Sequence, residues 1–210
     1  MIGVIDYEAG NTLSVIKALK YLGENVELTN DRSKLLKCDH IVFPGVGAFY
    51  DAMEKLRSYD LISTIRTTVE NDIPFLGICL GMQLLFDSSE ETIGSPDKDA
   101  ELIEGLGILP GKIKRFQEKS GFKIPQIGWN SVSIANKESR LFKGISDESY
   151  FYFVHSYYLK ADDDSCVAAR TEYINIFDSA VEKGNVFGCQ FHPEKSGDQG
   201  LHILKNFCEV

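Results

Sequence analysis

Residues 74–86 read PFLGICLGMQLLF, and this stretch decides the fold and the chemistry that the fold can carry. Phe75 to Cys79 is a continuous apolar run of strand length, and Gly77 and Gly81 flank the cysteine. An apolar run without alternation is typical of a parallel strand that is buried on both faces. The glycines leave room for a sharp turn from strand to helix, so the stretch predicts a strand that presents Cys79 at its end.

The segments before this strand alternate between strand and helix. We expect further strands at Ile2 to Ile5, Val26 to Leu28 and His40 to Phe43. Apolar residues at helical spacing predict a helix that Gly23 caps, and more helices around Phe49 to Leu56 and Leu61 to Val69. Apolar strands separated by amphipathic helices indicate a parallel sheet that is covered on both faces.

From residue 102 onward the pattern changes to β-rich segments with glycine and proline turns. A hairpin is expected at 182–186, and a final helix at about Gly200 to Phe207. No linker rich in Pro, Gly or Ser and no internal repeat separates the two halves. We therefore predict one α/β domain over residues 1–210: a mostly parallel sheet covered by helices on both faces, with an added β-rich section.

Composition excludes several classes of protein. The chain has 22 basic and 31 acidic residues, which gives a net charge of −9, and it has no block of Lys and Arg that would neutralise a polyphosphate. Nucleic acid is therefore not expected as a partner. The 5 cysteines contain no C-x-x-C pair, which disfavours zinc sites and disulfides and fits a reducing cytoplasm. We expect neither a membrane span nor an export signal.

Cys79 lies in a G-x-C-x-G pattern, a nucleophile elbow with cysteine in place of serine. A helix that begins after it would direct its positive end at the sulfur and favour the thiolate. The backbone N–H of Leu80 would then point at a developing oxyanion. The alternative is that Cys79 is a buried core cysteine, which is common for a thiol in an apolar run.

A thiolate nucleophile needs a base, and His192-Pro193-Glu194 supplies a candidate. The alternation of a strand places His192 and Glu194 on the same side, so that the carboxylate orients the imidazole. The alternative is a surface pair at a strand end. Among the 4 histidines, His192 is the one with a carboxylate two residues away and a proline between them.

The turn Pro44-Gly45-Val46-Gly47 follows a predicted strand. Glycine turns at the carboxyl end of parallel strands present backbone N–H groups at the edge where ligands bind. Val46 and Gly47 are therefore candidates for a second oxyanion donor, although many glycine turns are only turns.

These motifs together resemble the triad class of glutamine amidotransferases, on residues 77–83, which read GICLGMQ, and 192–194, which read HPE. Within this class, the chain resembles the glutaminase subunits of imidazole glycerol phosphate synthases over nearly its whole length. The further matching residues are Asp6-Tyr7, Gly10-Asn11, Pro44 to Gly47, Glu104 to Gly107, Gly128-Trp129-Asn130, Phe153 to Tyr157 and Lys195. The chain departs from the pattern at Glu8 and at Gln126-Ile127, which bears only on partner contacts.

The resemblance implies a class I amidotransferase fold and a Cys79, His192 and Glu194 triad that hydrolyses glutamine without a metal or an organic cofactor. It also implies that Gln83, His155, Ser156 and Tyr157 help to hold glutamine. The implied partner is a (β/α)8 cyclase subunit of histidine biosynthesis, which receives the ammonia in a heterodimer. The chain is too short to contain such an acceptor as well. Our candidates for the contact surface are Trp129, Asn130, Tyr152 and Lys195.

Three other functions fit parts of the sequence. The first is a glutaminase subunit that supplies a different acceptor, such as an amino-sugar pathway synthase. The second is a catalytically silent binding subunit on the same fold, which the intact triad disfavours. The third is a cysteine-dependent α/β hydrolase or peptidase. It is disfavoured because the acidic triad residue, which in that family lies between the nucleophile and the histidine in the sequence, is missing here.

Overall fold

The computed structural model describes residues 1–8, 12–97 and 99–210, and its centre is a run of parallel strands. These strands are β1 (Ile2–Ile5), β2 (Val26–Thr29), β3 (His40–Gly45), β4 (Phe75–Cys79) and β13 (Val186–Cys189), in the order β2-β1-β3-β4-β13. All four neighbouring pairs are parallel. The apolar run that holds Cys79 is therefore a central strand, buried along its whole length.

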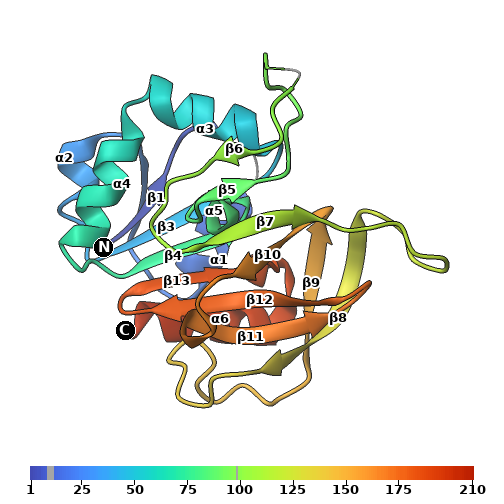
Figure 1. Ribbon diagram of the computed structural model, residues 1–210. Coiled ribbons are helices and arrows are strands. Elements are labelled where there is room, and N and C mark those ends of the chain that lie inside the picture. Colours follow the sequence, from blue (N-terminus) through green and yellow to red (C-terminus); the bar gives the residue numbers. More distant parts are fainter. Residues whose placement is uncertain (9–11, 98) are drawn as a thin grey trace.

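The β-rich half extends the same sheet on the β13 side (Figure 1). The path continues through β12 (Ile176–Lys183), β10 (Tyr157–Ala161), β7 (Gly111–Arg115), β5 (Ser88–Ser89) and β6 (Ile103–Glu104). A branch off β12 contains β11 (Val167–Glu172), β8 (Gln126–Ile134) and β9 (Ser149–His155). The added strands pair mainly antiparallel. A parallel centre with a β-rich addition is the architecture that we expected.

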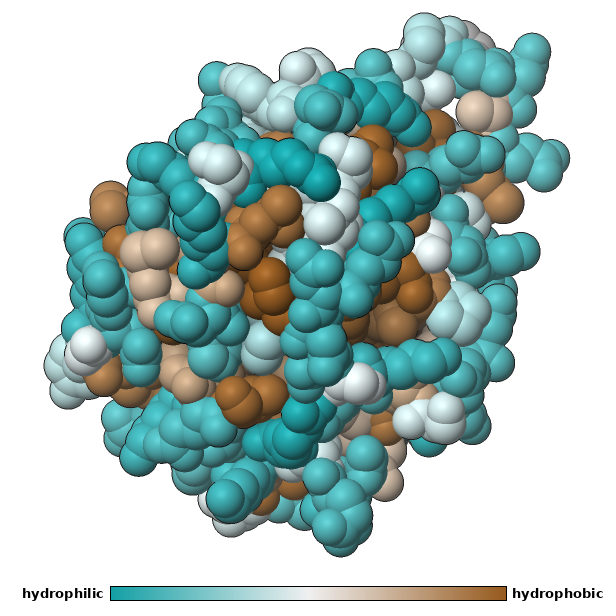
Figure 2. Space-filling model, turned by 90° about the vertical axis from the view of Figure 1, so that its left-hand side faces the viewer, coloured by the Kyte–Doolittle hydropathy of each residue, from teal (hydrophilic) through white to brown (hydrophobic). Residues whose placement is uncertain are grey.

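Helices cover both faces of the sheet. Two apolar cores show this division: one includes side chains of α2 (Arg32–Leu35), α3 (Phe49–Ser58) and α4 (Leu61–Glu70). The other includes side chains of α1 (Thr12–Tyr21) and α6 (Gly197–Cys208). The view from the side of α2 and α4 shows mostly hydrophilic side chains, with apolar ones in separate patches (Figure 2). Two 3-10 helices, η1 (Asp164–Cys166) and η2 (Pro193–Lys195), and the short α5 (Leu80–Gln83) complete the described elements.

Several turns and helix ends that the sequence predicts can be compared with the structure. Gly23 follows α1 with a φ of 91° and donates to the carbonyl of Lys20, as a helix cap does. Strands β12 and β13 form the expected hairpin, with Lys183 opposite Val186. Helix α6 begins at Gly197, earlier than predicted. Gly10 and Asn11 lie outside the described residues. Within the described part of the chain, no helix is both long and apolar enough to cross a membrane.

The strand register places three chain segments side by side at one edge of the sheet. Gly45 of β3 is paired with Cys79 of β4 on one side. On the other side, Cys189 of β13 is paired with Ile78, so the chain that follows Cys189 passes Cys79. Because parallel strands end at the same edge, residues from 45–47, 79–80 and 190–192 meet there.

Candidate active site

Cys79 occupies the strained position that a nucleophile elbow requires. Its φ is 54° and its ψ is −111°, a backbone conformation that residues with a side chain rarely adopt. The flanking glycines allow close packing. A Cβ at Gly81 would lie 1.8 Å from the carbonyl oxygen of Phe43, and one at Gly77 would lie 2.7 Å from Cα of Met82. The G-x-C-x-G pattern is therefore a steric requirement of this turn.

The helix after Cys79 is short. Helix α5 has only 4 residues, Leu80–Gln83. It ends because the carbonyls of Leu84 and Leu85 accept hydrogen bonds from the backbone of residues 106–109 instead of continuing the helix. A single turn aligns few peptide dipoles, so its field at the sulfur is weaker than that of a long helix. The state of the thiol therefore depends more on neighbouring side chains.

His192 and Glu194 form a buried pair. His192 Nδ1 lies 2.9 Å from Glu194 Oε1, and the two side chains are 2% and 0% exposed. Burial acts to lower the pKa of His192, but its interactions with Cys79 and with the Glu194 carboxylate raise that pKa to about 10. The arrangement favours the protonated imidazolium form of His192 over the neutral ring. The expected pairing of His192 with Glu194 is confirmed at the level of contact.

Hydrogen bonds also attach the backbone of His192 to strand β9. The N–H of His192 donates to the carbonyl of Tyr152 at 2.9 Å. Ser196 Oγ donates to the carbonyl of His192 at 2.7 Å and accepts from the N–H of Tyr152 at 3.0 Å. His192 is therefore fixed at both its side chain and its backbone.

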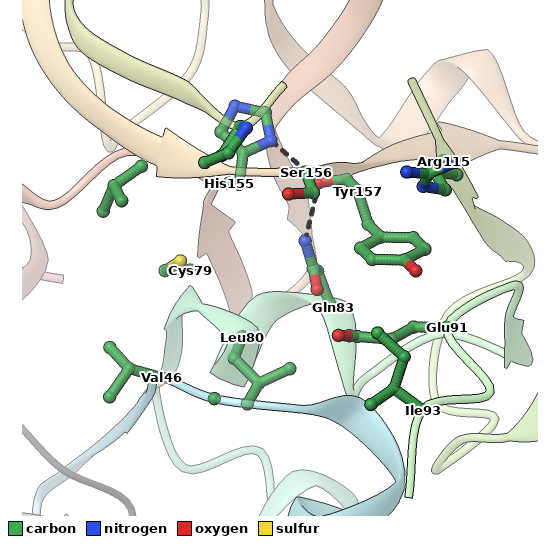
Figure 3. Close-up of a pocket in the computed structure, with 13 residues that line it drawn as sticks. Val46, Cys79, Leu80, Gln83, Glu91, Ile93, Arg115, His155, Ser156 and Tyr157 are labelled. Carbon is green, nitrogen blue, oxygen red and sulfur yellow. Dashed lines mark hydrogen bonds between the residues drawn. The ribbon is translucent and has the colours of Figure 1, made fainter. Parts of the chain in front are cut away.

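A pocket of about 410 Å³ opens beside Cys79. The residues predicted to hold the oxyanion and glutamine line it together with Cys79: Val46, Gly47, Leu80, Gln83, His155, Ser156 and Tyr157. Figure 3 shows Cys79 at one end of this pocket and Arg115, Glu91 and Ile93 at the other. The structure thus brings the predicted residues into one place, while their roles in binding stay predictions.

Two predicted binding residues, His155 and Gln83, each have one side-chain nitrogen hydrogen-bonded within the protein. His155 Nδ1 lies 2.8 Å from the carbonyl oxygen of Tyr157, and burial lowers the pKa of His155 to about 4. The ring is therefore neutral near pH 7, and Nδ1 carries the proton because a carbonyl only accepts. Gln83 Nε2 donates to the same carbonyl and to Gln190 Oε1, each at 2.9 Å (Figure 3 draws the bond to Tyr157).

Three residues at the site did not emerge from the sequence analysis: Gln190, Glu91 and Arg115. Gln190 Nε2 lies 3.6 Å from Cys79 Sγ. The expected contact of Glu194 with His192 forms through the 3-10 helix η2 and not by strand alternation, because β13 ends at Cys189. The two-residue spacing from His192 back to Gln190 was the signal that could have found it. Glu91 and Arg115 line the far end of the pocket. They come from segments with no motif, and only the fold brings them to Cys79.

Among the predicted contact residues, Trp129, Tyr152 and Lys195 gather on one surface. The Trp129 and Tyr152 rings meet edge to face at 6.2 Å, and Lys195 Nζ lies 5.9 Å from the Tyr152 ring centre. Asn130 does not join them, because its amide donates to the carbonyl of Glu172. Ile127 of β8 and Tyr150 of β9 lie on the same exposed face of these paired strands as Trp129 and Tyr152. We call Ile127, Trp129, Tyr150, Tyr152 and Lys195 the β8–β9 patch.

In residues 1–8, 12–97 and 99–210, no group of three or more His, Cys, Asp or Glu side chains is placed to hold a metal ion. Cys38, Cys79, Cys166, Cys189 and Cys208 are all free thiols.

Comparison with known proteins identifies relatives along the entire chain. The chain is 50% identical to "Imidazole glycerol phosphate synthase subunit HisH" of Methanocaldococcus jannaschii over 210 residues, which are 100% of both proteins. It is 46% identical to the protein of the same name from Moorella thermoacetica, over 100% of this chain and 94% of the relative. A solved structure described as a glutamine amidotransferase superposes with a TM-score of 0.71 at 20% identity, over 99% of this chain and 98% of that one.

The structural likeness confirms the expected fold, and the family model described as "Glutamine amidotransferase class-I" matches residues 3–210. A strained cysteine, a buried His–Glu pair and a pocket lined by Cys79 agree with that match. The chain belongs to the class-I glutamine amidotransferase family.

Proposed function

We propose that this protein is the glutaminase subunit of an imidazole glycerol phosphate synthase, with Cys79, His192 and Glu194 as its catalytic triad. One observation carries the assignment of the triad. Cys79 lies at a strained strand end, the chain that contains His192 passes it at the sheet edge, and His192 Nδ1 lies 2.9 Å from the buried Glu194 carboxylate. The names of the 50% and 46% identical relatives support the assignment of the pathway.

In the proposed reaction, the Cys79 thiolate attacks the side-chain amide carbon of glutamine. The backbone N–H groups of Leu80 and of the Val46-Gly47 turn stabilise the oxyanion. His192 protonates the departing nitrogen, which leaves as ammonia, and a glutamyl thioester remains on the sulfur. His192 then takes a proton from water, the hydroxide attacks the thioester, and glutamate and the thiolate are released. Glu194 orients the imidazole throughout.

The charges at the far end of the pocket fit the free amino-acid end of glutamine. We propose that Glu91 binds the α-ammonium group and that Arg115 binds the α-carboxylate. Glu91 is half-buried and accepts from the N–H of Phe49 at 3.1 Å, which fixes its direction. Burial raises the pKa of Glu91, and an ammonium group next to it would restore the ionised form. Ser156 and Tyr157 lie between the two ends (Figure 3).

The product requires a partner, because ammonia released into water becomes ammonium, which is not a nucleophile. We propose that a (β/α)8 cyclase subunit covers the β8–β9 patch and receives the ammonia. Trp129 is 55% exposed and meets the Tyr152 ring edge to face, and Lys195 Nζ lies 5.9 Å from the centre of that ring. Aromatic and cationic residues of this kind dominate the binding energy of many interfaces. The proposed location is the cytoplasm, which the free cysteines support, and the proposed organisation is a single domain over residues 1–210.

The decisive experiment compares the wild type with Cys79→Ala in the complex with the cyclase. We expect Cys79→Ala to abolish glutamate release and glutamine-dependent synthesis, while synthesis from ammonium salts at high pH remains. Continued glutamine-dependent synthesis by that variant would overturn the triad assignment. A cyclase that neither binds the chain nor uses its ammonia would overturn the pathway assignment and favour a different acceptor.

The substrate-orienting residues have their own test. Arg115→Leu and Glu91→Gln should raise KM for glutamine at least tenfold, because each removes one charge partner of the amino-acid end. Alkylation of Cys79 by uncharged iodoacetamide should be unaffected, which separates substrate binding from the reactivity of the thiol. Unchanged KM in both variants would contradict the proposed orientation.

A further inference from the structure

Gln190 follows strand β13 and lies beside the nucleophile. Because Cys189 is paired with Ile78, the residues that follow them, Gln190 and Cys79, lie side by side at the sheet edge. The Gln190 side chain is fully buried, and its Nε2 lies 3.6 Å from Cys79 Sγ. Its Oε1 accepts from Gln83 Nε2 at 2.9 Å. A buried amide is therefore in contact with the reacting sulfur, and the proposed reaction gives it no step.

The neighbours of Gln190 determine which end of its amide faces the sulfur. The carbonyl of Tyr157 accepts from His155 Nδ1 at 2.8 Å and from Gln83 Nε2 at 2.9 Å. A carbonyl accepts only, so Gln83 must present its NH2 group there. The second hydrogen of that NH2 group points at Gln190, so the group of Gln190 that accepts this hydrogen bond must be its oxygen, Oε1. The NH2 group of Gln190 is then left to face Cys79.

We propose that Gln190 is a positioning residue for the nucleophile, and that it donates a hydrogen bond that favours the thiolate of Cys79 over the thiol. The proposal rests on the proposed role of Cys79. A hydrogen bond to the charged form of an acid stabilises that form, and in a buried site water does not compete for the donor. Only one helical turn follows Cys79, so the helix dipole stabilises a negative charge on the sulfur weakly. A hydrogen bond from Gln190 adds to that stabilisation.

The chain Tyr157, Gln83, Gln190 and Cys79 also links the pocket wall to the sulfur. Tyr157 and Gln83 line the pocket, and Gln190 is buried behind them. Each amide in this chain orients the next one. Replacing the donor group of Gln83 with an acceptor should therefore reorient the Gln190 amide, and this changes the hydrogen bond to Cys79 although residue 83 itself does not contact the sulfur. Two substitutions at different positions should therefore have the same effect on the thiol.

The test measures the rate of Cys79 alkylation by iodoacetamide as a function of pH in the full chain, with modification quantified at the peptide that contains Cys79. Gln190→Met keeps the length of the side chain and removes the donor. Gln190→Glu keeps the shape and presents only acceptors when ionised. We expect the midpoint of the rate profile to rise by about one pH unit or more in both, with a larger shift for Glu. The limiting rate at high pH should stay within about threefold.

Gln83→Glu extends the test without altering residue 190. A carboxylate at 83 cannot donate to Gln190, so the amide of Gln190 turns to donate to it and presents its oxygen to the sulfur. The midpoint should rise as it does in Gln190→Met. Gln126→Met is the matched control, because Gln126 is also a buried glutamine and has no described contact with Cys79. Its profile should match that of the wild type.

Unchanged midpoints in Gln190→Met and Gln190→Glu, with folded protein by circular dichroism, would overturn the proposal and leave Gln190 as a packing residue. A wild type that fails to release glutamate with its cyclase present would instead overturn the proposed function. The two failures are distinguishable because alkylation does not require glutamine or a partner.

Discussion

The backbone on the two sides of Cys79 is held to very different degrees. On the β13 side, the N–H of Gln190 donates to the carbonyl of Ser179, and hydrogen bonds to Tyr152 and Ser196 hold the backbone of His192. Helix α6 packs so closely here that a Cβ at Gly200 would lie 1.9 Å from the carbonyl oxygen of Pro193. This side has no room for rearrangement.

On the β3 side, the turn that contains Val46 and Gly47 has space around it. Val46 is 37% exposed, and a Cβ at Gly47 would meet no atom within 4 Å. The turn lines the pocket of Cys79 and also a second cavity of about 360 Å³ on its other side. Its carbonyl at Pro44 accepts from the buried hydroxyl of Tyr7 at 3.0 Å.

The difference indicates that the proposed nucleophile and base are preformed, whereas the proposed second oxyanion donor at Val46-Gly47 is adjustable. We therefore expect the isolated chain to have a reactive Cys79 but little glutaminase activity until its partner and the partner's ligand bind. Strong glutamine turnover by the purified chain alone would contradict this division. The following substitutions compare the two sides, in order of decreasing effect.

Gly200→Ala against Gly47→Ala is the sharpest contrast. At 200, the new methyl group would overlap the backbone of η2, so unfolding free energy should fall by about 3 kcal/mol or more and glutaminase activity should be lost. At 47, the φ of 108° is the main obstacle, so the loss should be about 1 to 2 kcal/mol. Urea unfolding of both variants measures this. Equal losses would remove the distinction between a packed and an open side.

The charge state of His192 gives a pH test of the preformed side. Since Cys79 and Glu194 raise the pKa of His192 from 6.5 to about 10 against the effect of burial, its protonation stabilises the folded state fully below pH 6.5. That stabilisation is lost as the pH rises through about 10. In Cys79→Ala, only Glu194 is left to oppose the effect of burial, so the pKa of His192 should fall by several units. NMR titration of the His192 ring measures both values, and an unchanged pKa in the variant would contradict the pairing.

Ser196→Ala removes the hydroxyl that connects His192 with Tyr152. The N–H of Tyr152 loses its acceptor, and the carbonyl of His192 keeps only the N–H of Lys195 as a donor. We therefore expect a loss of about 1 to 2 kcal/mol in unfolding free energy and a lower kcat. Ser58→Ala is the control, because Ser58 is exposed at the end of α3 and should change stability by less than about 0.5 kcal/mol. If the two serine variants are equally stable and active, the backbone of His192 does not depend on this hydroxyl.

Tyr7→Phe should have the smallest effect of the series and should act only on the open side. The Pro44 carbonyl loses its donor, which costs about 1 kcal/mol. We expect a several-fold lower kcat in the complex with no change in the rate of Cys79 alkylation. Tyr21→Phe, at a residue that is 79% exposed, is the control. Slower alkylation in Tyr7→Phe would show that the two sides of Cys79 are coupled.

The sequence was sufficient for the parts of the site that short-range geometry controls. Glycines around Cys79 predict a strained turn wherever that segment packs, and a two-residue spacing brings Glu194 to His192. The same spacing rule pointed at Gln190, but a neutral amide has no chemistry that draws attention without its neighbour. The length of α5 was not predictable, since hydrogen bonds from residues 106–109 end it.

What the sequence determined by itself was the parallel centre of the sheet, the triad candidates and the resemblance to one family, because these depend on local backbone preferences and on spacing along the chain. Only the tertiary structure decided that Gln190, Glu91 and Arg115 share a site with Cys79, and that one side of the sulfur is packed while the other is open. The physical reason is strand pairing. Register between β4 and β13 joins residues that are more than a hundred positions apart, and packing against the strands on each side of Cys79 determines which segments can still move.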